Sequence, residues 1–169
     1  WLRKSGIPFL SNVSAAYELM TRARLTHHRP PYRIDTVKVG NREVRVTEEV
    51  VYSTPFGSLL RFRKDTDVAQ PKVLLVAPLS GHFATLLRNT VQTLLQDNDV
   101  YITDWHNARD VPLSAGEFGM DGYIGHVIDF LEQLGPRSHV VAVCQPCVQA
   151  LAATSIMAED DNPATPASL

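Results

Sequence analysis

The sequence has only two cysteines, at positions 144 and 147 of its 169 residues. Two thiols three positions apart cannot build the disulfide framework of a small secreted protein, so a reducing compartment is favoured. No uninterrupted apolar run approaches the roughly 18–20 residues of a membrane span, and the first four residues (WLRK) lack the apolar core of a signal peptide. Neither G-x-G-x-x-G nor G-x-x-x-x-G-K occurs, so nucleotide binding has no motif to support it.

What is present is the composition of a globular protein. Apolar residues make up 44% of the chain and charged residues 20%, with nine glycines and eleven prolines. These proportions exclude wholesale disorder, collagen-like repeats and low-complexity sequence. The length fits about one ordinary domain of roughly 100–200 residues.

Charge is concentrated at the N-terminal end. Residues 1–34 hold six basic and one acidic side chain, a net charge of +5, and the remainder holds 10 basic and 17 acidic side chains, a net charge of −7. A basic segment suits nucleic acid or an anionic surface. Because its arginines do not alternate with a regular series of aromatic stacking platforms, we expect no nucleic-acid partner. We interpret residues 1–33 as a basic helical arm.

Hydrophobic spacing divides the rest of the chain into strands and helices. Alternation of period two and continuous apolar runs predict strands over 34–39, 42–52, 58–64, 73–77, 100–103 and 139–143. Helical spacing predicts helices over 11–25, 83–95, 120–134 and 148–158, and the polar, proline-containing stretch 159–166 has the composition of a linker. Hairpins followed by β-α-β-α-β-α predict a three-layer α/β fold. Its sheet is mostly parallel with antiparallel leading strands, and residues 34–169 form this domain.

The most informative segment is HVVAV-Cys144-Gln145-Pro146-Cys147. A polar nucleophile directly after a buried strand and before a helix occupies a nucleophile-elbow position. The amides at a helix N-terminus stabilise negative charge, which favours a thiolate there. The usual box is G-x-S-x-G. Here a small residue is kept two places before Cys144, but proline replaces the second glycine.

Three other interpretations of this segment stay open. Cys-x-Pro-Cys at a helix start is also the dithiol motif of thioredoxin-like oxidoreductases, although here only 22 residues follow Cys147. A zinc half-site lacks a second Cys/His pair with ligand spacing. Finally, both cysteines would serve simply as small buried apolar residues at a strand–helix junction.

A second segment, VLLVA-Pro78-Leu79-Ser80-Gly81-His82, follows a predicted buried strand. In a hydrolase sheet such a loop supplies one backbone amide to the oxyanion hole, and the residue after the nucleophile supplies the other. An ordinary βα turn is the competing interpretation.

The remaining polar candidates have less informative settings. Asp104 precedes Cys144 in the chain, whereas a triad acid normally follows the nucleophile, so we interpret it as structural. His106, His126 and His139 also precede Cys144, and none is an obvious general base.

Together, VLLVAPLSGHFATLLR, DVYITDWHNARDVPLSAGEF and VVAVCQPCVQALAA resemble the intracellular polyhydroxyalkanoate (poly-3-hydroxybutyrate) depolymerases. The similarity runs from about Tyr17 to the C-terminal end, with APLSGH, TDW, VPLSAG and VCQP in matching order. These enzymes have an α/β-hydrolase fold and a cysteine nucleophile, as do the related polyhydroxyalkanoate synthases.

The resemblance implies that Cys144 attacks the ester carbonyl to form a thioester, with Leu79, Ser80 and the Gln145 amide around the oxyanion. The histidine and aspartate of the family's triad do not map onto this chain. We therefore expect an N-terminal fragment whose sheet is incomplete at the C-terminal end. Cys147 departs from the family pattern, which has no second thiol at this position. Such a thiol would make the nucleophile more susceptible to oxidation or disulfide exchange.

The resemblance also implies the surroundings of the protein. It predicts no metal and no organic cofactor, a polyester granule as substrate and partner, and a cytoplasmic location at such granules. A homo-oligomer is left open. Two rival functions remain: a thiol-disulfide oxidoreductase using Cys144 and Cys147, and a non-catalytic granule-binding module.

Overall fold

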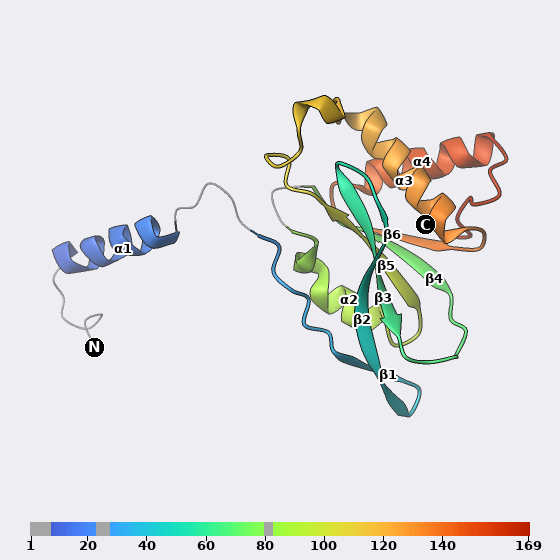
Figure 1. Ribbon diagram of the computed structural model, residues 1–169, viewed down its shortest axis with the longest axis horizontal. Helices are drawn as coiled ribbons and strands as arrows, with labels where there is room; N and C mark the ends of the chain where they lie inside the picture. The colour runs from blue at the N-terminus through green and yellow to red at the C-terminus, as the bar shows by residue number, and fades with distance from the viewer. Residues whose placement is uncertain (1–7, 23–27, 80–82) are drawn as a thin grey trace.

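The computed structural model describes residues 8–22, 28–79 and 83–169 (Figure 1). Within these ranges the strands are β1 (Thr36–Val39), β2 (Arg42–Ser53), β3 (Gly57–Lys64), β4 (Lys72–Val76), β5 (Asp99–Trp105) and β6 (His139–Ala142). The helices are α1 (Pro8–Arg22), η2 (Ala84–Leu87), α2 (Arg88–Leu94), η3 (Leu113–Ala115), α3 (Met120–Leu134) and α4 (Cys147–Glu159), where η marks a 3-10 helix.

The strands form one sheet in the order β1-β2-β3-β5-β4-β6. The leading strands pair antiparallel, β1 with β2, β2 with β3 and β3 with β5, whereas β4 pairs parallel with both β5 and β6. The first hairpin turns at Gly40, whose φ of +57° is a conformation that glycine adopts readily. The α/β fold class with antiparallel leading strands is therefore confirmed.

Alternation along β4 explains the three layers. Leu74 and Val76 belong to a core that includes residues of α3 and α4, and Leu75 and Ala77 belong to a second core that includes residues of η2 and α2. Successive side chains of a strand point to opposite faces, so one apolar run buries both sides of the sheet. Figure 1 shows α3 and α4 together on one side of the sheet and α2 on the other.

The predicted elements differ from the structure in three places. The helix expected over 83–95 is split into η2 and α2, and the strand expected over 100–103 extends over Asp99–Trp105. The stretch 159–166 is not a free linker, because Ala164 and Pro166 are buried and the Val140 amide donates to the Ser168 carbonyl at 2.9 Å. Part of the helix expected over 11–25, from residue 23 onward, lies outside the described residues.

The predicted basic arm contains helix α1, which stands apart from the sheet in Figure 1. Its apolar side chains Val13, Tyr17, Leu19 and Met20 are all exposed. Farther along the arm, Tyr32 is fully buried and its ring meets Phe62 edge-on at a centroid distance of 4.8 Å. The end of the arm is therefore packed into the sheet domain.

Two lysines bind the open carbonyls at the ends of helices. Lys64 Nζ donates to the carbonyls of Leu95 at 2.6 Å and Asn98 at 2.7 Å, and to the Gln70 side chain. Burial lowers the pKa of Lys64. Lys72 Nζ similarly donates to the Leu134 carbonyl at 2.6 Å, in the last turn of α3. Both contacts satisfy carbonyls that have no partner within the helix.

We expect Lys64→Met to lower the free energy of unfolding by about 1–3 kcal/mol, because it leaves half-buried carbonyls without a donor. Urea denaturation followed by circular dichroism measures the change. Lys38→Met, at an exposed position of the edge strand β1, is the matched control and should change stability by less than about 0.5 kcal/mol. Equal stability of the two variants would contradict this role for Lys64.

Candidate functional site

The turn between β6 and α4 holds Cys144 in a strained backbone conformation. Its φ is +68°, in the left-handed region that residues other than glycine rarely adopt. The preceding Val143 amide donates to the Val76 carbonyl, which ties the turn to β4. The Cys144 side chain is exposed. A strained strand-to-helix turn that carries an exposed thiol is the backbone geometry of a nucleophile elbow.

Cys147 begins α4 three residues later. Its Sγ lies 3.4 Å from the Ala142 carbonyl oxygen, so the thiol donates toward the end of β6. Cys147 is exposed, and neither cysteine forms a disulfide. The structure therefore contains two thiols on one turn, with Cys147 directed back at its own strand.

The loop after β4 is fixed at Ala77 by three side chains. The Ala77 amide donates to Thr103 Oγ1 at 2.9 Å, and its carbonyl accepts from Trp105 Nε1 at 2.9 Å and from the Tyr123 hydroxyl at 3.1 Å. Burial strongly raises the pKa of Tyr123, so its hydroxyl remains a donor. Both polar atoms of the Ala77 peptide units are thus satisfied inside the protein, which holds the start of the loop in one place.

This loop meets the Cys144 turn through one hydrogen bond. The Leu79 amide donates to Gln145 Oε1 at 2.9 Å. The two segments that the sequence singled out, joined here by residues 66 positions apart in the chain, are therefore neighbours at the carboxyl ends of β4 and β6. Of the predicted site residues, Cys144, Gln145 and Leu79 are brought together here, and Ser80 lies outside the described residues.

Asp104 takes part in an ion-pair network. Its carboxylate, 16% exposed, lies 2.9 Å from Arg29 Nε, and Arg29 Nη2 lies 3.2 Å from Glu48 Oε2. Burial raises the pKa of Asp104, and the nearby Arg29 and His106 oppose that shift. These contacts join the end of the N-terminal arm to β5, which agrees with the structural role expected for Asp104.

His106 is oriented by the β2–β3 hairpin. Its Nδ1 lies 3.1 Å from the Pro55 carbonyl oxygen and its Nε2 lies 2.8 Å from Ser58 Oγ. A carbonyl oxygen only accepts, so Nδ1 carries a proton. In the neutral ring Nε2 then accepts the proton of Ser58. Neither nitrogen is directed at Cys144 by these bonds.

His126 is held in the same way on α3. Its Nδ1 donates to the Gly122 carbonyl at 2.7 Å, and its Nε2 lies 3.0 Å from Thr54 Oγ1. Its ring is surrounded by the aromatic rings of Phe56, Trp105, Phe118 and Phe130. Both histidines therefore fasten the hairpin to the rest of the domain. His139, the third candidate, contacts Ser168 at 2.9 Å.

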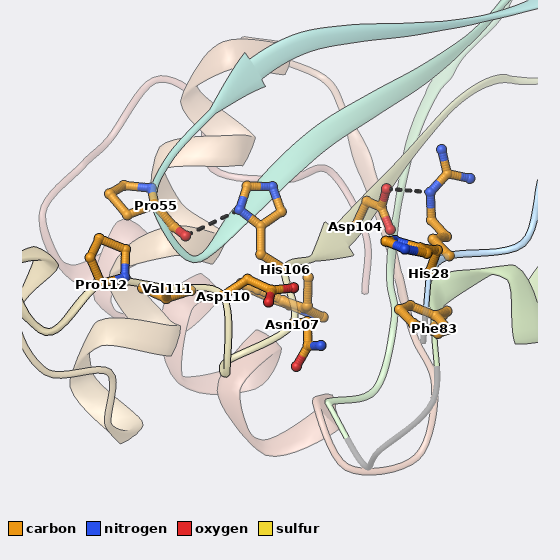
Figure 2. A pocket seen from close by; sticks show the side chains of 11 residues that line it. His28, Pro55, Phe83, Asp104, His106, Asn107, Asp110, Val111 and Pro112 are labelled. Atoms are coloured by element: carbon orange, nitrogen blue, oxygen red, sulfur yellow. Dashed lines mark hydrogen bonds and ion pairs between the residues drawn. The ribbon is translucent and has the colours of Figure 1, made fainter. Parts of the chain in front are cut away.

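Two cavities open beside this region. The first, of about 350 Å³, is lined by polar and apolar side chains in similar proportion (Figure 2). Figure 2 shows Asp104 and His28 on one side of it and Pro55, Val111 and Pro112 on the other. The second cavity, of about 290 Å³, is mostly apolar and includes Leu79 in its wall. His106, Val111 and Pro112 line both cavities and so separate them.

The described ranges contain no cluster of three or more His, Cys, Asp or Glu side chains arranged to hold a metal ion. None of the helices in these ranges combines the length and apolar character needed to cross a bilayer.

Sequence reasoning missed the side chains that fix the loop after β4. Trp105 was visible only as the last residue of TDW, and Tyr123 as one position on an amphipathic helix. Both side chains donate a hydrogen bond to the same backbone carbonyl. Every residue has a backbone carbonyl, so the sequence does not indicate which one they bind. The bond from the Leu79 amide to the Gln145 side chain was missed for the same reason.

The sheet order, the three layers and the strained strand-to-helix turn are similar to those of the α/β-hydrolase fold. No protein-family model matches the sequence, and no curated protein matches it.

Two solved structures are similar to this chain. Naproxen esterase (carboxylesterase NP) from Bacillus subtilis aligns over 69% of this chain and 40% of its own, with 19% identity and a TM-score of 0.48. A predicted CIB-like hydrolase from Thermoplasma acidophilum aligns over 71% of this chain and 59% of its own, with 12% identity and a TM-score of 0.43. The chain thus covers less than two thirds of the length of each of these two structures.

Tyr123→Phe tests whether the tyrosine hydroxyl fixes the loop. We expect the free energy of unfolding to fall by about 0.5–1.5 kcal/mol, the contribution of one hydrogen bond. We also expect faster hydrogen exchange of the Leu79 amide, measured by NMR, because Ala77 loses one of its two donors. Tyr17→Phe, on the exposed surface of α1, is the control. Unchanged Leu79 exchange in Tyr123→Phe would contradict the role assigned to this hydroxyl.

Proposed function

We propose that Cys144 is the nucleophile of an ester hydrolase and that its substrate is an intracellular polyhydroxyalkanoate. The observation that carries the proposal is the exposed Cys144 side chain on a positive-φ turn, next to the loop that holds the Leu79 amide. A backbone that stores strain at one exposed thiol is explained by a chemical role for that thiol.

The reaction would proceed in two steps. The Cys144 thiolate attacks the ester carbonyl carbon, a carbon–sulfur bond forms, and the negative charge moves to the carbonyl oxygen. The carbon–oxygen bond then breaks, the alcohol leaves with the proton that the general base took from the Cys144 thiol, and a thioester remains on Cys144. Water hydrolyses the thioester to release the hydroxy acid and regenerate the thiol.

The backbone amides of Gln145 and Leu79 would stabilise the oxyanion, together with that of Ser80 as the resemblance implies. In the structure the Leu79 amide already has an acceptor, the side-chain oxygen of Gln145. That oxygen belongs to a carbonyl group, as does the ester oxygen that would take its place. An ester must therefore displace the Gln145 carboxamide from Leu79 before this donor becomes available.

The general base and its carboxylate partner would be supplied from outside these 169 residues. Every histidine of the chain precedes Cys144, and the hydrogen bonds of His106 and His126 attach them to the β2–β3 hairpin.

The proposal of a polyester substrate rests on the resemblance of the three sequence segments. A polyester substrate implies that the partner is the apolar surface of a polymer granule in the cytoplasm. The proposed reaction needs no cofactor.

Replacing each cysteine separates this proposal from its two rivals. In the full-length protein, we expect Cys144→Ala to reduce 3-hydroxybutyrate release from granules by at least about 10³-fold. Cys147→Ala should keep most of the activity. Cosedimentation with granules should persist in both variants, and thermal denaturation checks their folding.

The rivals predict different results. A thiol-disulfide oxidoreductase would lose insulin-reducing activity equally in the two variants, and a purely granule-binding module would release no hydroxy acid in any form. Full turnover by Cys144→Ala would refute the nucleophile.

Gln145→Ala tests whether the carboxamide competes with the substrate. Removing it frees the Leu79 amide, so we expect kcat/KM for ester hydrolysis to rise about 2- to 10-fold, the equivalent of one hydrogen bond. The backbone amide of residue 145 is unchanged by this substitution. Gln145→Glu keeps an acceptor at the same reach and should not show the gain. A loss of activity in Gln145→Ala would show instead that the carboxamide positions the loop.

A further inference from the structure

A third hollow lies between the end of the N-terminal arm and the start of α2. It is open to solvent and measures about 550 Å³. Its walls come from residues 30–33 of the arm and from residues 83–88, which include η2 and the first residue of α2. These two segments lie side by side (Figure 1), and Arg88 Nη2 donates to the Arg33 backbone carbonyl at 3.0 Å, across 55 positions of the chain. The hollow is therefore made by tertiary contact and not by one loop.

All the polar side chains that line this hollow can donate hydrogen bonds. They are the guanidinium groups of Arg33 and Arg88 and the hydroxyl of Thr85, and no carboxylate or carboxamide lines the walls. Among the described residues, no acidic side chain forms an ion pair with either guanidinium. In the cavity of Figure 2, by contrast, Arg29 is paired with Asp104 at 2.9 Å. Two positive charges without a counter-charge from the described protein favour an anionic ligand in this hollow.

The backbone that carries Arg33 is held in one conformation. Arg33 has a φ of +53°, in the left-handed region that residues other than glycine rarely adopt. Its two neighbours, Tyr32 and Ile34, are buried, and its carbonyl is bonded to Arg88. Backbone strain of this kind persists only where the surrounding structure imposes it. These contacts therefore fix the backbone of the site before any ligand binds, which reduces the conformational entropy that binding must remove.

The other walls of the hollow are apolar. Leu86 is 59% exposed, and it lines the hollow together with Phe83 and the two prolines of the arm, Pro30 and Pro31. A hydrocarbon group that covers Leu86 would remove apolar surface from water, which is favourable. The paired N–H donors of a guanidinium bind a carboxylate and a phosphate in the same way.

We propose that this hollow binds an amphiphilic anion. Its carboxylate or phosphate group contacts Arg33 and Arg88, and its hydrocarbon part covers Leu86. The proposal goes beyond the proposed function, because none of the residues that line the hollow takes part in the proposed reaction.

Titration of the methyl-labelled full-length protein with four small molecules tests both halves of the site. We expect hexanoate and hexyl phosphate to shift the NMR methyl signals of Thr85 and Leu86. Hexanol, which lacks the charge, should bind about tenfold more weakly than hexanoate, the loss of contacts to two exposed arginines. Acetate, which lacks the hydrocarbon part, should also bind at least about tenfold more weakly. Added salt should weaken binding of the anions and not of hexanol. Binding of only one of the two six-carbon anions would support the site and identify its head group.

Substitutions in the hollow supply the matched comparison. Arg33→Gln and Arg88→Gln should each weaken hexanoate binding about two- to fivefold, and the double variant should weaken it by about tenfold or more. Arg42→Gln removes the same charge at an exposed position of β2 outside the hollow and should leave binding unchanged. Leu86→Ala should weaken binding of hexanoate and not of acetate. Circular dichroism checks the folding of each variant, and Arg88→Lys keeps the charge if Arg88→Gln is poorly folded.

Three results would each overturn the proposal: equal affinities for hexanoate and hexanol, equal hexanoate binding by the double variant and the wild-type protein, or methyl shifts only outside the hollow. The outcome is independent of the proposal for Cys144. Hexanoate binding at the hollow of a protein whose Cys144→Ala variant keeps full turnover would support this site and refute only the nucleophile. Cys144-dependent turnover without methyl shifts at Thr85 and Leu86 would refute only this site.

Discussion

The carbonyl oxygen of Ala77 is the point on which the arrangement of the site depends. It accepts hydrogen bonds from Trp105 at the end of β5 and from Tyr123 in α3, while the Ala77 amide donates to Thr103. These bonds connect the loop after β4 to the neighbouring strand and to a helix of the layer above it. These hydrogen bonds also fix the position of Leu79, two residues farther along the loop. They thereby fix the direction of the Leu79 amide, which donates to Gln145.

Close packing around Trp105 extends the same constraint to the β2–β3 hairpin. A Cβ atom at Gly57 would lie 2.8 Å from Trp105 Cε3, so only glycine allows the strand to approach this ring. Trp105 also packs edge-on against Tyr123, with ring centroids 4.5 Å apart. The residue that holds the Ala77 carbonyl is thereby fixed from two sides, and loop and hairpin form one packed unit.

The sequence was sufficient for most of the elements and for the α/β fold class, because helices and strands follow from local periodicity. The order of the strands in the sheet was not predicted. The apolar run of β4 identifies a strand and the helical spacing of α3 identifies a helix, without knowledge of the elements that pack against them. The Cys144 turn was also predictable, since a strand, a polar residue and a helix follow one another directly. Long-range hydrogen bonds to backbone atoms could not be predicted. The ion pair of Arg29 with Asp104 could not be predicted either, because no spacing rule links two charges 75 positions apart. The cavities depend on how the segment 106–118 folds back, which periodicity does not encode.

The positive φ of Cys144 has an energetic consequence for the whole domain. A side chain in the left-handed region raises the energy of the folded state by roughly 1–2 kcal/mol relative to glycine. That is a sizeable part of the roughly 5–15 kcal/mol by which a typical domain is stable. A glycine at this position would relieve the backbone strain and make the protein more stable, but it would remove the thiol. The fold thus keeps a strained residue at a place where a thiol is exposed, so that thermal stability and chemical reactivity make opposite demands on position 144.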